Sequence, residues 1–388
     1  MSKDIIRALD ELGLEQPSRI QATAIPLIVE DPYNNLIAQS QNGTGKTLAF
    51  VLSSIIRVDP SSTDVEAIVL CPMRELAVQT YSIYLQVLKY TCNIKVSLVV
   101  PDAAKTGLGH ILVGTPKTLM DIIDRSKKKF EKLKMFIVDE ADMAFETKGE
   151  ISKQVMMIYK KTNPKKQVVL FSATFSAEIM NSAKELVKEA TIMKMPTQKL
   201  TLTGVLQLYI KCEAKSKFKT ILDIYKKITI VQTLVFCNTR HCSEAFYKFM
   251  NSNGIKASIL IGGMSPAERD ATIKSFKARE TSMLISTNVL ARGYDNRYIT
   301  FVINLDIPKR IGESQDPDTE SYLHRVGRTG RFGDVGVALN IVENDSDMKL
   351  IDSLKTFYSC KIEETDLEKL PKQVNEVKKL REQQESEA

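Results

Sequence analysis

The fold class is decided by one stretch, IAQSQNGTGKTLAF, which spans Ile37–Phe50. An apolar run leads into a polar turn that contains Gly43 and Gly45, and a second apolar run follows. Glycines at such a turn let successive backbone N–H groups point into one hollow. The helix expected over Leu48–Ile56 directs the positive end of its dipole to the same place. This order of strand, turn and helix predicts an anion-binding loop in an α/β fold.

Two side chains of the turn strengthen this prediction. Lys46 adds a full positive charge, and the Thr47 hydroxyl is suited to bind Mg²⁺. The motif G-x-x-x-x-G-K-[ST] is complete except that Ser40 stands at its first position. The alternative is an ordinary glycine turn with a surface lysine. The expected contacts of a nucleoside triphosphate are Ser40, Gln41, Asn42, Gly43, Thr44, Gly45, Lys46 and Thr47.

The length and composition indicate a globular protein with two domains. A chain of 388 residues exceeds one ordinary core, and 43% hydrophobic with 26% charged residues excludes a disordered chain. No apolar run approaches the roughly 20 residues that cross a bilayer, and the start lacks the apolar region of a signal peptide. We expect an intracellular protein without membrane insertion. The formal charge of +7 is compatible with nucleic acid but does not demand it.

Short apolar runs alternate with longer amphipathic stretches along the whole chain. This alternation predicts a parallel sheet covered by helices on both faces in each half. Right-handed crossovers then bring the loops after the strands to one edge of each sheet, where ligands bind. The expected strands are Leu36–Ala38, Ala67–Cys71, Ile111–Val113, Phe136–Val138 and Val168–Phe171, and then Leu208–Cys212, Thr233–Cys237, Ser258–Ile261, Met283–Ser286, Phe301–Leu305 and Val337–Val342.

The boundary between the halves is expected in MKMPTQKLTLTG, Met193–Gly204, where a proline and polar residues interrupt the pattern. We therefore divide the chain into an N-terminal domain over 1–195, a linker over 196–205, a C-terminal domain over 206–370 and a charged tail over 371–388.

Six cysteines are scattered along the chain, and two of them, Cys237 and Cys242, flank His241. This spacing invites a metal-site interpretation. Because no second pair of ligands lies nearby in the sequence, a reduced, structural role is favoured.

A second constellation lies in MFIVDEAD, where an apolar strand ends in Asp139 and Glu140. A carboxylate here, beside a phosphate loop, is suited to hold Mg²⁺ through its water shell, and we assign this role to Asp139. Glu140 is suited to orient and deprotonate an attacking water. For the acidic residues alone, the alternative is the capped start of a helix.

These motifs resemble those of the DEAD-box RNA helicase family. QNGTGKT at 41–47, DEAD at 139–142 and SAT at 172–174 occur in that family's order. The resemblance implies that Gln21, in PSRIQ, reads the adenine edge, for which a carboxamide offers one donor and one acceptor. It also implies RNA-backbone contacts by Pro72, Arg74, Thr115 and Pro116, and coupling between nucleotide and RNA by Ser172 and Thr174.

The second half carries two further motifs, STNVLARGYD at Ser286–Asp295 and HRVGRTGR at His324–Arg331. Glycines permit close backbone approach, and two arginines three residues apart can reach phosphate oxygens. The alternative, a merely basic surface loop, is disfavoured by the order of the motif. The resemblance implies arginine fingers at Arg328 and Arg331, a ribose contact at Asp295, RNA contacts at Thr287 and Arg269, and coupling by His324.

The resemblance implies two tandem RecA-like domains, each a mostly parallel sheet covered by helices on both faces. They would bind ATP with Mg²⁺ in a cleft and single-stranded RNA, or a short duplex, across the opposite face. RNA would be held by its sugar–phosphate backbone, so that binding is largely independent of base sequence. The expected catalytic set is Lys46, Asp139, Glu140, Arg328 and Arg331.

The polar insertion after Pro308 is similar to that of the messenger-RNA export helicases associated with nuclear pores. This resemblance implies nucleoporins and an inositol-hexakisphosphate-dependent activator as partners of a monomer found in cytoplasm and nucleus, up to the cytoplasmic face of the pore. Thr118 replaces an arginine, as in that subgroup. The aromatic residue upstream of the glutamine motif and the long N-terminal extension are both missing. We therefore expect differences in adenine binding and autoinhibition.

Three other functions stay open. A general RNA helicase in translation or ribosome assembly would carry the same motifs. A translocating DNA helicase would unwind long duplexes. An RNA-binding adaptor insensitive to ATP would not need the catalytic set, so the presence of Lys46, Glu140, Arg328 and Arg331 argues against it.

Overall fold

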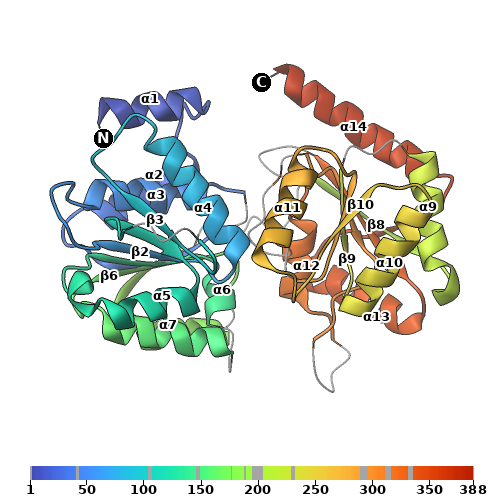
Figure 1. Ribbon diagram of the computed structural model, residues 1–388. Helices are drawn as coiled ribbons and strands as arrows, with labels where there is room; N and C mark the ends of the chain where they lie inside the picture. Colours follow the sequence, from blue (N-terminus) through green and yellow to red (C-terminus); the bar gives the residue numbers. More distant parts are fainter. Residues whose placement is uncertain are drawn as a thin grey trace. The chain divides into compact units, whose positions relative to one another are not determined.

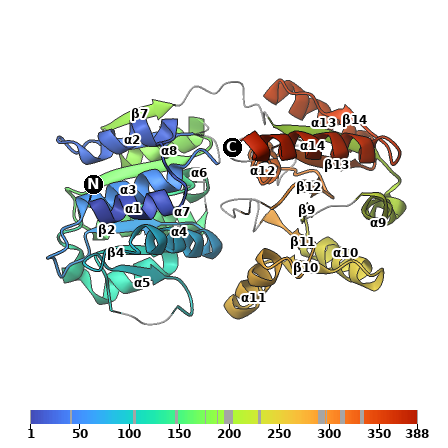
Figure 2. The same ribbon diagram turned by 90° about the horizontal axis from the view of Figure 1, so that it is seen from above.

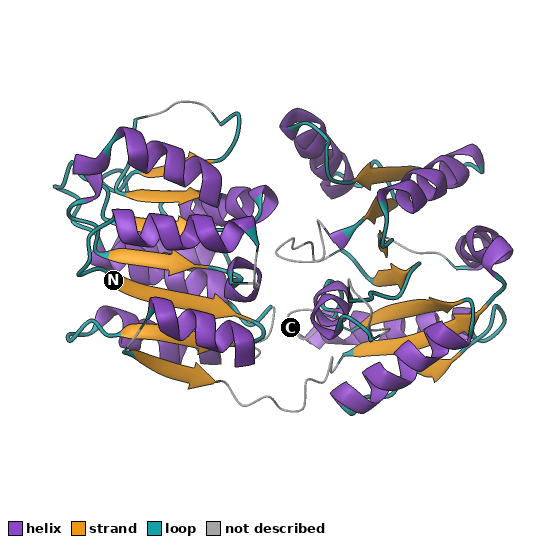
Figure 3. Ribbon diagram, turned by 90° about the horizontal axis from the view of Figure 1, so that it is seen from below, coloured by secondary structure: helices purple, strands orange, loops and turns teal. Residues whose placement is uncertain are grey.

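The chain folds into two units, Met1–Thr197 and Gln198–Ala388, each of which is described by itself. Each unit contains a sheet between layers of helices (Figures 1 and 3). The computed structural model describes residues 2–40, 43–103, 107–145, 149–175, 177–187, 189–194, 204–228, 232–288, 296, 298–310, 316–330 and 335–387.

The sheet of the first unit has seven described strands in the order β3-β4-β2-β5-β6-β1-β7, and all described pairs are parallel. Its five inner strands were expected from the sequence, because buried parallel strands are continuous apolar runs. The two edge strands are only partly buried, and β7 lies at the edge in Figure 2. The strands are β1 (Asn35–Gln39), β2 (Ala67–Leu70), β3 (Val96–Val99), β4 (Ile111–Gly114), β5 (Met135–Val138), β6 (Gln167–Ser172) and β7 (Ala190–Lys194).

Helices cover both faces of this sheet (Figure 1). One face packs against α1 (Lys3–Glu11), α2 (Arg19–Val29), α3 (Lys46–Arg57) and α4 (Arg74–Val87). The other face packs against α5 (Pro116–Arg125), the 3₁₀ helix η1 (Lys127–Phe130), α6 (Ala141–Ala144), α7 (Glu150–Lys161) and α8 (Ala177–Leu186).

The sheet of the second unit also has seven described strands, in the order β10-β11-β9-β12-β13-β8-β14, again with parallel pairing. The expected strands lie within a few residues of the observed ones, and only the two-residue β14 has no counterpart among them. The strands are β8 (Val205–Lys211), β9 (Thr233–Phe236), β10 (Ala257–Leu260), β11 (Met283–Ser286), β12 (Phe301–Asn304), β13 (Gly336–Val342) and β14 (Glu363–Glu364).

The helices of the second unit also pack on both faces. The segment that the sequence suggested as a charged tail forms α14, whose Leu370 and Val374 are buried against the sheet. Among the described helices of the whole chain, none combines the length and apolar character that crossing a membrane requires. One layer contains α9 (Lys217–Lys227), α10 (Arg240–Ser252) and α14 (Leu370–Glu387), and the other α11 (Pro266–Lys277), α12 (Thr319–Val326) and α13 (Asp345–Tyr358); the short η2 (Ala214–Ser216) precedes α9.

Candidate active site

The described residues of the first unit that were expected around the triphosphate meet at the carboxyl edge of its sheet. Strand β6 lies between β5 and β1. Ser40 follows β1, Asp139 follows β5, and Ser172 is the last residue of β6. The backbone N–H of Ser40 donates to the Ser172 carbonyl at 3.0 Å. Since adjacent parallel strands end at the same edge, the phosphate loop, the acidic pair and the SAT motif come together.

The phosphate loop is held in a conformation that depends on its glycines. Gly43 and Gly45 have φ of 78° and 94°, in the left-handed region that favours glycine. Gly45 is the N-cap of α3 and brings no side chain to the first N–H groups of that helix, which are suited to bind an anion. The Lys46 ammonium donates to the Ser40 carbonyl at 2.7 Å, so the lysine lies in the loop. Gln41 and Asn42 lie outside the described residues.

Gln21 connects helix α2 to the phosphate loop, a contact that the sequence did not reveal. Its carboxamide oxygen accepts from the Ser18 N–H at 2.9 Å in a capping box, and its nitrogen donates to the Gly45 carbonyl at 3.1 Å. A carboxamide has two N–H donors and an oxygen with two lone pairs. These contacts therefore leave capacity for an adenine edge, and adenine reading by Gln21 stays a prediction.

The acidic pair is buried and strained. Asp139 and Glu140 are 3% and 5% exposed. Burial, and then the charge of Glu140, raise the pKa of the Asp139 carboxyl to about 7, while Lys46 opposes this shift. Glu140 has φ of 48°, and a non-glycine residue in that region costs about 1–3 kcal/mol and is frequent at functional sites.

This pair fits a hydrated divalent cation. Among the residues that the structure describes, no hydrogen-bond donor reaches the buried Oε2 of Glu140. A cation would offset the mutual repulsion that disfavours two buried carboxylates. Asp139 and Thr47 are the residues that would hold Mg²⁺ there, and the ion would supply charge stabilisation for phosphoryl oxygens.

The SAT motif bonds directly to the last residue of DEAD. The Ser172 hydroxyl oxygen accepts from the backbone N–H groups of Asp142 and Thr174, each at 3.3 Å. The Thr174 hydroxyl donates to the Asp142 carboxylate at 3.1 Å. The predicted coupling residues Ser172 and Thr174 are therefore in contact with the loop that holds the acidic pair.

The RNA contacts expected in the first unit lie at neighbouring strand ends. Strands β2 and β4 pair, and the Cys71 N–H donates to the Gly114 carbonyl at 2.9 Å. Arg74 begins α4, two residues after Pro72, while Thr115 precedes Pro116 at the start of α5. The structure thus groups these four residues, and their contact with RNA stays a prediction.

In the second unit, the expected RNA residues also lie at one sheet edge. Strands β10 and β11 pair, and the Arg269 guanidinium donates to the Ile261 carbonyl, just after β10, at 3.5 Å. Thr287 directly follows β11. Arg240, which the sequence analysis did not select, begins α10 and lies close to Gly263, since its guanidinium nitrogen would be 2.8 Å from a Cβ there. A contact of Arg240 with RNA would be a further prediction.

The HRVGR motif is organised by an arginine that the sequence analysis did not select. Arg325 is buried, and burial lowers its pKa to about 10, so it stays charged at neutral pH. Its guanidinium donates to Asn238 Oδ1 at 2.9 Å, to Asn288 Oδ1 at 2.7 Å and to the Asp306 carbonyl at 2.8 Å. Arg325 therefore connects three loops at the carboxyl edge of the second sheet.

The remaining predicted residues of this unit are only partly described. The Arg328 side chain donates to the His324 carbonyl at 2.9 Å, within its own motif. Asp295 and Arg331 lie outside the described residues.

The two domains that match known families cover the described motifs: residues 18–182 match the DEAD/DEAH box helicase domain and residues 216–333 match the helicase conserved C-terminal domain.

The chain belongs to the DEAD/DEAH box helicase family. It is similar to the ATP-dependent RNA helicase DBP5 of Debaryomyces hansenii, with 39% identity over 92% of this chain and 73% of the relative. The corresponding helicase of Schizosaccharomyces pombe is 34% identical over 98% of this chain and 76% of its own length.

Solved structures agree with this assignment and confirm the tandem RecA-like fold. Saccharomyces cerevisiae Dbp5 bound to RNA and ADP BeF3 has a TM-score of 0.92 and 33% identity, with 97% of each chain covered. A Dbp5 variant of the same species, bound to a Gle1 variant and IP6, has a TM-score of 0.80 and 33% identity over 97% of this chain and 96% of that one.

Proposed function

We propose that this protein is an RNA-stimulated ATPase that clamps single-stranded RNA by its backbone and separates short duplexes during messenger-RNA export. The observation that carries this proposal is the buried pair Asp139 and Glu140 beside Lys46 and the phosphate loop. That arrangement matches what phosphoryl transfer requires, namely positioning and charge stabilisation.

Within the first unit, each group has a defined role. The first N–H groups of α3 and the Lys46 ammonium bind the phosphates. Asp139 and Thr47 are the residues that would hold Mg²⁺, which would supply positive charge for the phosphate oxygens. Glu140 orients the attacking water and accepts its proton, and the free Oε2 lone pairs are suited to that task.

The second unit supplies Arg328 and Arg331 to the γ-phosphate in the closed state. Positive charge in this position contributes about 10³–10⁵ in rate in related phosphoryl-transfer systems. Arg325 does not reach the nucleotide in this proposal. It positions the motif, because its guanidinium is already shared by Asn238, Asn288 and Asp306.

RNA binds at the two groups of strand-end residues, one in each unit. Helix N-termini and basic side chains of this kind contact phosphates without reading bases. An RNA strand that both units hold in a bent conformation does not fit into a duplex. Closure of the two units with ATP would therefore separate short RNA duplexes, and hydrolysis of ATP would reopen the clamp.

A role in export is supported by the structures of Dbp5. Saccharomyces cerevisiae Dbp5 has been solved with Gle1 and IP6, and with Nup159, Gle1, IP6 and ADP. We infer that this protein also acts at the nuclear pore and uses partners of the Nup159 and Gle1 type with inositol hexakisphosphate.

RNA-stimulated phosphate release tests the proposed activity. Lys46→Ala should reduce this release about tenfold or more, because the phosphates lose their point charge. Lys165→Ala is the matched control, since Lys165 is exposed and precedes β6 at the opposite edge of the sheet. RNA binding by the wild-type protein that is identical with and without ATP would instead indicate the adaptor function.

A further inference from the structure

Two cysteines and an aspartate converge in the second unit, next to the loops that Arg325 connects, through side chains that the proposed mechanism does not use. Cys237 directly follows β9, Cys242 lies in the first turn of α10, and Asp306 follows β12, which pairs with β9. One ligand atom of each residue lies within 4.8 Å of the other two. We propose that Cys237, Cys242 and Asp306 form a binding site for a thiophilic divalent cation such as Zn²⁺.

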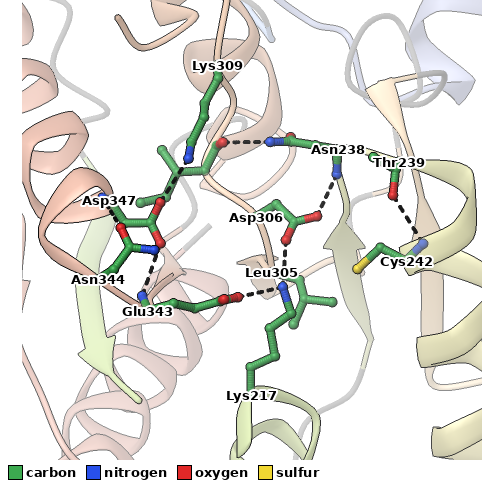
Figure 4. A pocket seen from close by; sticks show the side chains of 11 residues that line it. Lys217, Asn238, Thr239, Cys242, Leu305, Asp306, Lys309, Glu343, Asn344 and Asp347 are labelled. Carbon is green, nitrogen blue, oxygen red and sulfur yellow. Dashed lines mark hydrogen bonds and ion pairs between the residues drawn. The ribbon is translucent and has the colours of Figure 1, made fainter. Parts of the chain in front are cut away.

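The site is open to solvent on one side. Cys242 and Asp306 line a cavity of about 330 Å³ together with Lys217, Asn238 and residues of the α13 start. Figure 4 shows the Cys242 sulfur pointing into this pocket on the side of Asp306. Cys237 is fully buried behind it. An ion can therefore enter through the pocket and reach the inner thiolate last.

The ligand chemistry selects a soft ion. Thiolate sulfur prefers Zn²⁺ over Mg²⁺, whereas Mg²⁺ prefers oxygen ligands in octahedral geometry. Two sulfurs and one carboxylate oxygen leave the fourth tetrahedral position to water from the pocket. The Mg²⁺ used with ATP is thus not expected to compete for this site.

The third ligand is already oriented. The Asp306 carboxylate accepts from the Asn238 N–H at 2.8 Å and from the Lys217 ammonium at 2.8 Å. Such outer contacts on a metal-ligating carboxylate are typical of built metal sites, and each oxygen keeps a lone pair for the ion.

The charges of the site largely compensate one another. Two thiolates and one carboxylate carry three negative charges, and the ion carries two positive charges. The Lys217 ammonium is shared between Asp306 and Glu343, at 2.8 and 2.5 Å, so these groups together keep one net negative charge. Binding releases the two thiol protons to solvent, so the apparent affinity should rise with pH until both thiols are deprotonated.

Cadmium titration of the full chain under a non-thiol reductant tests this site, because Cd²⁺ bound to thiolate gives an ultraviolet charge-transfer band. We expect one Cd²⁺ per chain, displaced by Zn²⁺ and not by Mg²⁺. Cys242→Ser and Asp306→Asn should each weaken binding about tenfold or more. Cys92→Ser, at an exposed cysteine of the first unit, should leave the band and the affinity unchanged.

Thermal denaturation distinguishes loss of the metal site from misfolding of a variant. Zn²⁺ should raise the Tm of the wild-type protein and of Cys92→Ser, and should raise that of a folded Asp306→Asn variant clearly less. No charge-transfer band at equimolar Cd²⁺, or equal affinity in all variants, would overturn the proposal. So would a Cys237–Cys242 disulfide found by non-reducing peptide mapping of the purified protein, because it would show that the two sulfurs pair with each other.

Discussion

At the scale of single residues, Gly45 shows how backbone conformation and side-chain contact together determine the phosphate loop. It combines φ of 94° with direct contact to Gln21, and a Cβ at this position would collide with the Gln21 carboxamide. The segment that contains Gln21 and the phosphate loop are thus one structural unit, although Gln21 and Gly45 are 24 positions apart in the sequence.

Gly45→Ala should destabilise the first unit by about 1–3 kcal/mol and weaken ATP binding, because strain and collision both displace the loop. Urea denaturation and nucleotide titration measure the two effects. Gly13→Ala is the matched control, since Gly13 has φ of 70° but nothing within 4 Å of its Cβ position. Equal losses in the two variants would show that Gln21 does not constrain the loop.

Lys166 offers a test of pH dependence. Its ammonium donates to the carbonyls of Tyr159 and Asn163, at 2.8 and 3.0 Å, and burial lowers its pKa to about 8 from 10.5. Between these two pH values the unfolded chain holds more protons than the folded one, so the free energy of unfolding rises with pH. Below pH 8 both states are protonated, and this contribution is flat.

Between pH 8 and pH 10.5, the free energy of unfolding of the wild type should rise by an amount on the order of 1 kcal/mol, a value reduced to allow for solvent screening. Lys166→Met should abolish this rise. Denaturation curves of the wild type and the variant across this range give the difference. Lys165→Met, at the exposed neighbour, should keep the rise. If the free energy of unfolding changed with pH in the same way in the wild type and in Lys166→Met, the lowered pKa of Lys166 would be contradicted.

Sequence motifs predicted Lys46, Asp139 and Glu140 because these residues lie within short segments whose spacing is set by local geometry. Arg325 and Asp306 escaped the sequence analysis because their partners are distant along the chain. Asn238 and Asn288, for example, meet Arg325 only when three strands align in the sheet.

At the scale of elements, apolar content determined what could be predicted. The inner strands were found because their residues are buried on both faces. The edge strands β3 and β7 are only partly buried, and polar residues interrupt their short apolar runs, namely Ser97 in β3 and Thr191 and Lys194 in β7, so their hydrophobic signal is weak. The charged composition of α14 likewise concealed the few apolar residues that attach it to the second sheet.

Leu370→Ala should destabilise the second unit by about 2–5 kcal/mol, because Leu370 is fully buried and its loss leaves a cavity. Leu380→Ala is the same substitution on the same helix at a side chain that is 51% exposed, and it should cost about 0.5 kcal/mol or less. Thermal denaturation of both variants measures the contrast. Similar Tm values for the two would mean that α14 does not contribute to the core.

At the scale of the whole molecule, the proposed function requires residues from two units that each have their own sheet and core. In that proposal, the first unit contributes the phosphate loop and the acidic pair, the second contributes the arginines, and neither set alone would be a complete site for hydrolysis. Nucleotide state and RNA affinity should therefore be linked by a coupling free energy, which acts equally in both directions.

Glu140→Gln tests this coupling. Glutamine keeps the size of glutamate but does not accept the proton of water, so hydrolysis should stop. Lys46, Asp139 and the phosphate loop are unchanged, and ATP with Mg²⁺ should still bind. Because the closed clamp then persists, RNA should dissociate from this variant about tenfold or more slowly with ATP than without nucleotide.

A comparison of ATP with ADP, and of Glu140→Gln with a control variant, distinguishes an effect on closure from general damage to the site. ADP lacks the γ-phosphate that the arginines would contact in the proposed closed state, so RNA should dissociate from Glu140→Gln in ADP as fast as without nucleotide. Glu131→Gln, at an exposed glutamate that precedes β5, should hydrolyse ATP and release RNA like the wild type. RNA lifetimes on Glu140→Gln that are equal in ATP, in ADP and without nucleotide would show that the two sites are independent. In that case the bonds between SAT and DEAD stabilise only the first unit, and closure would have to be driven by RNA alone.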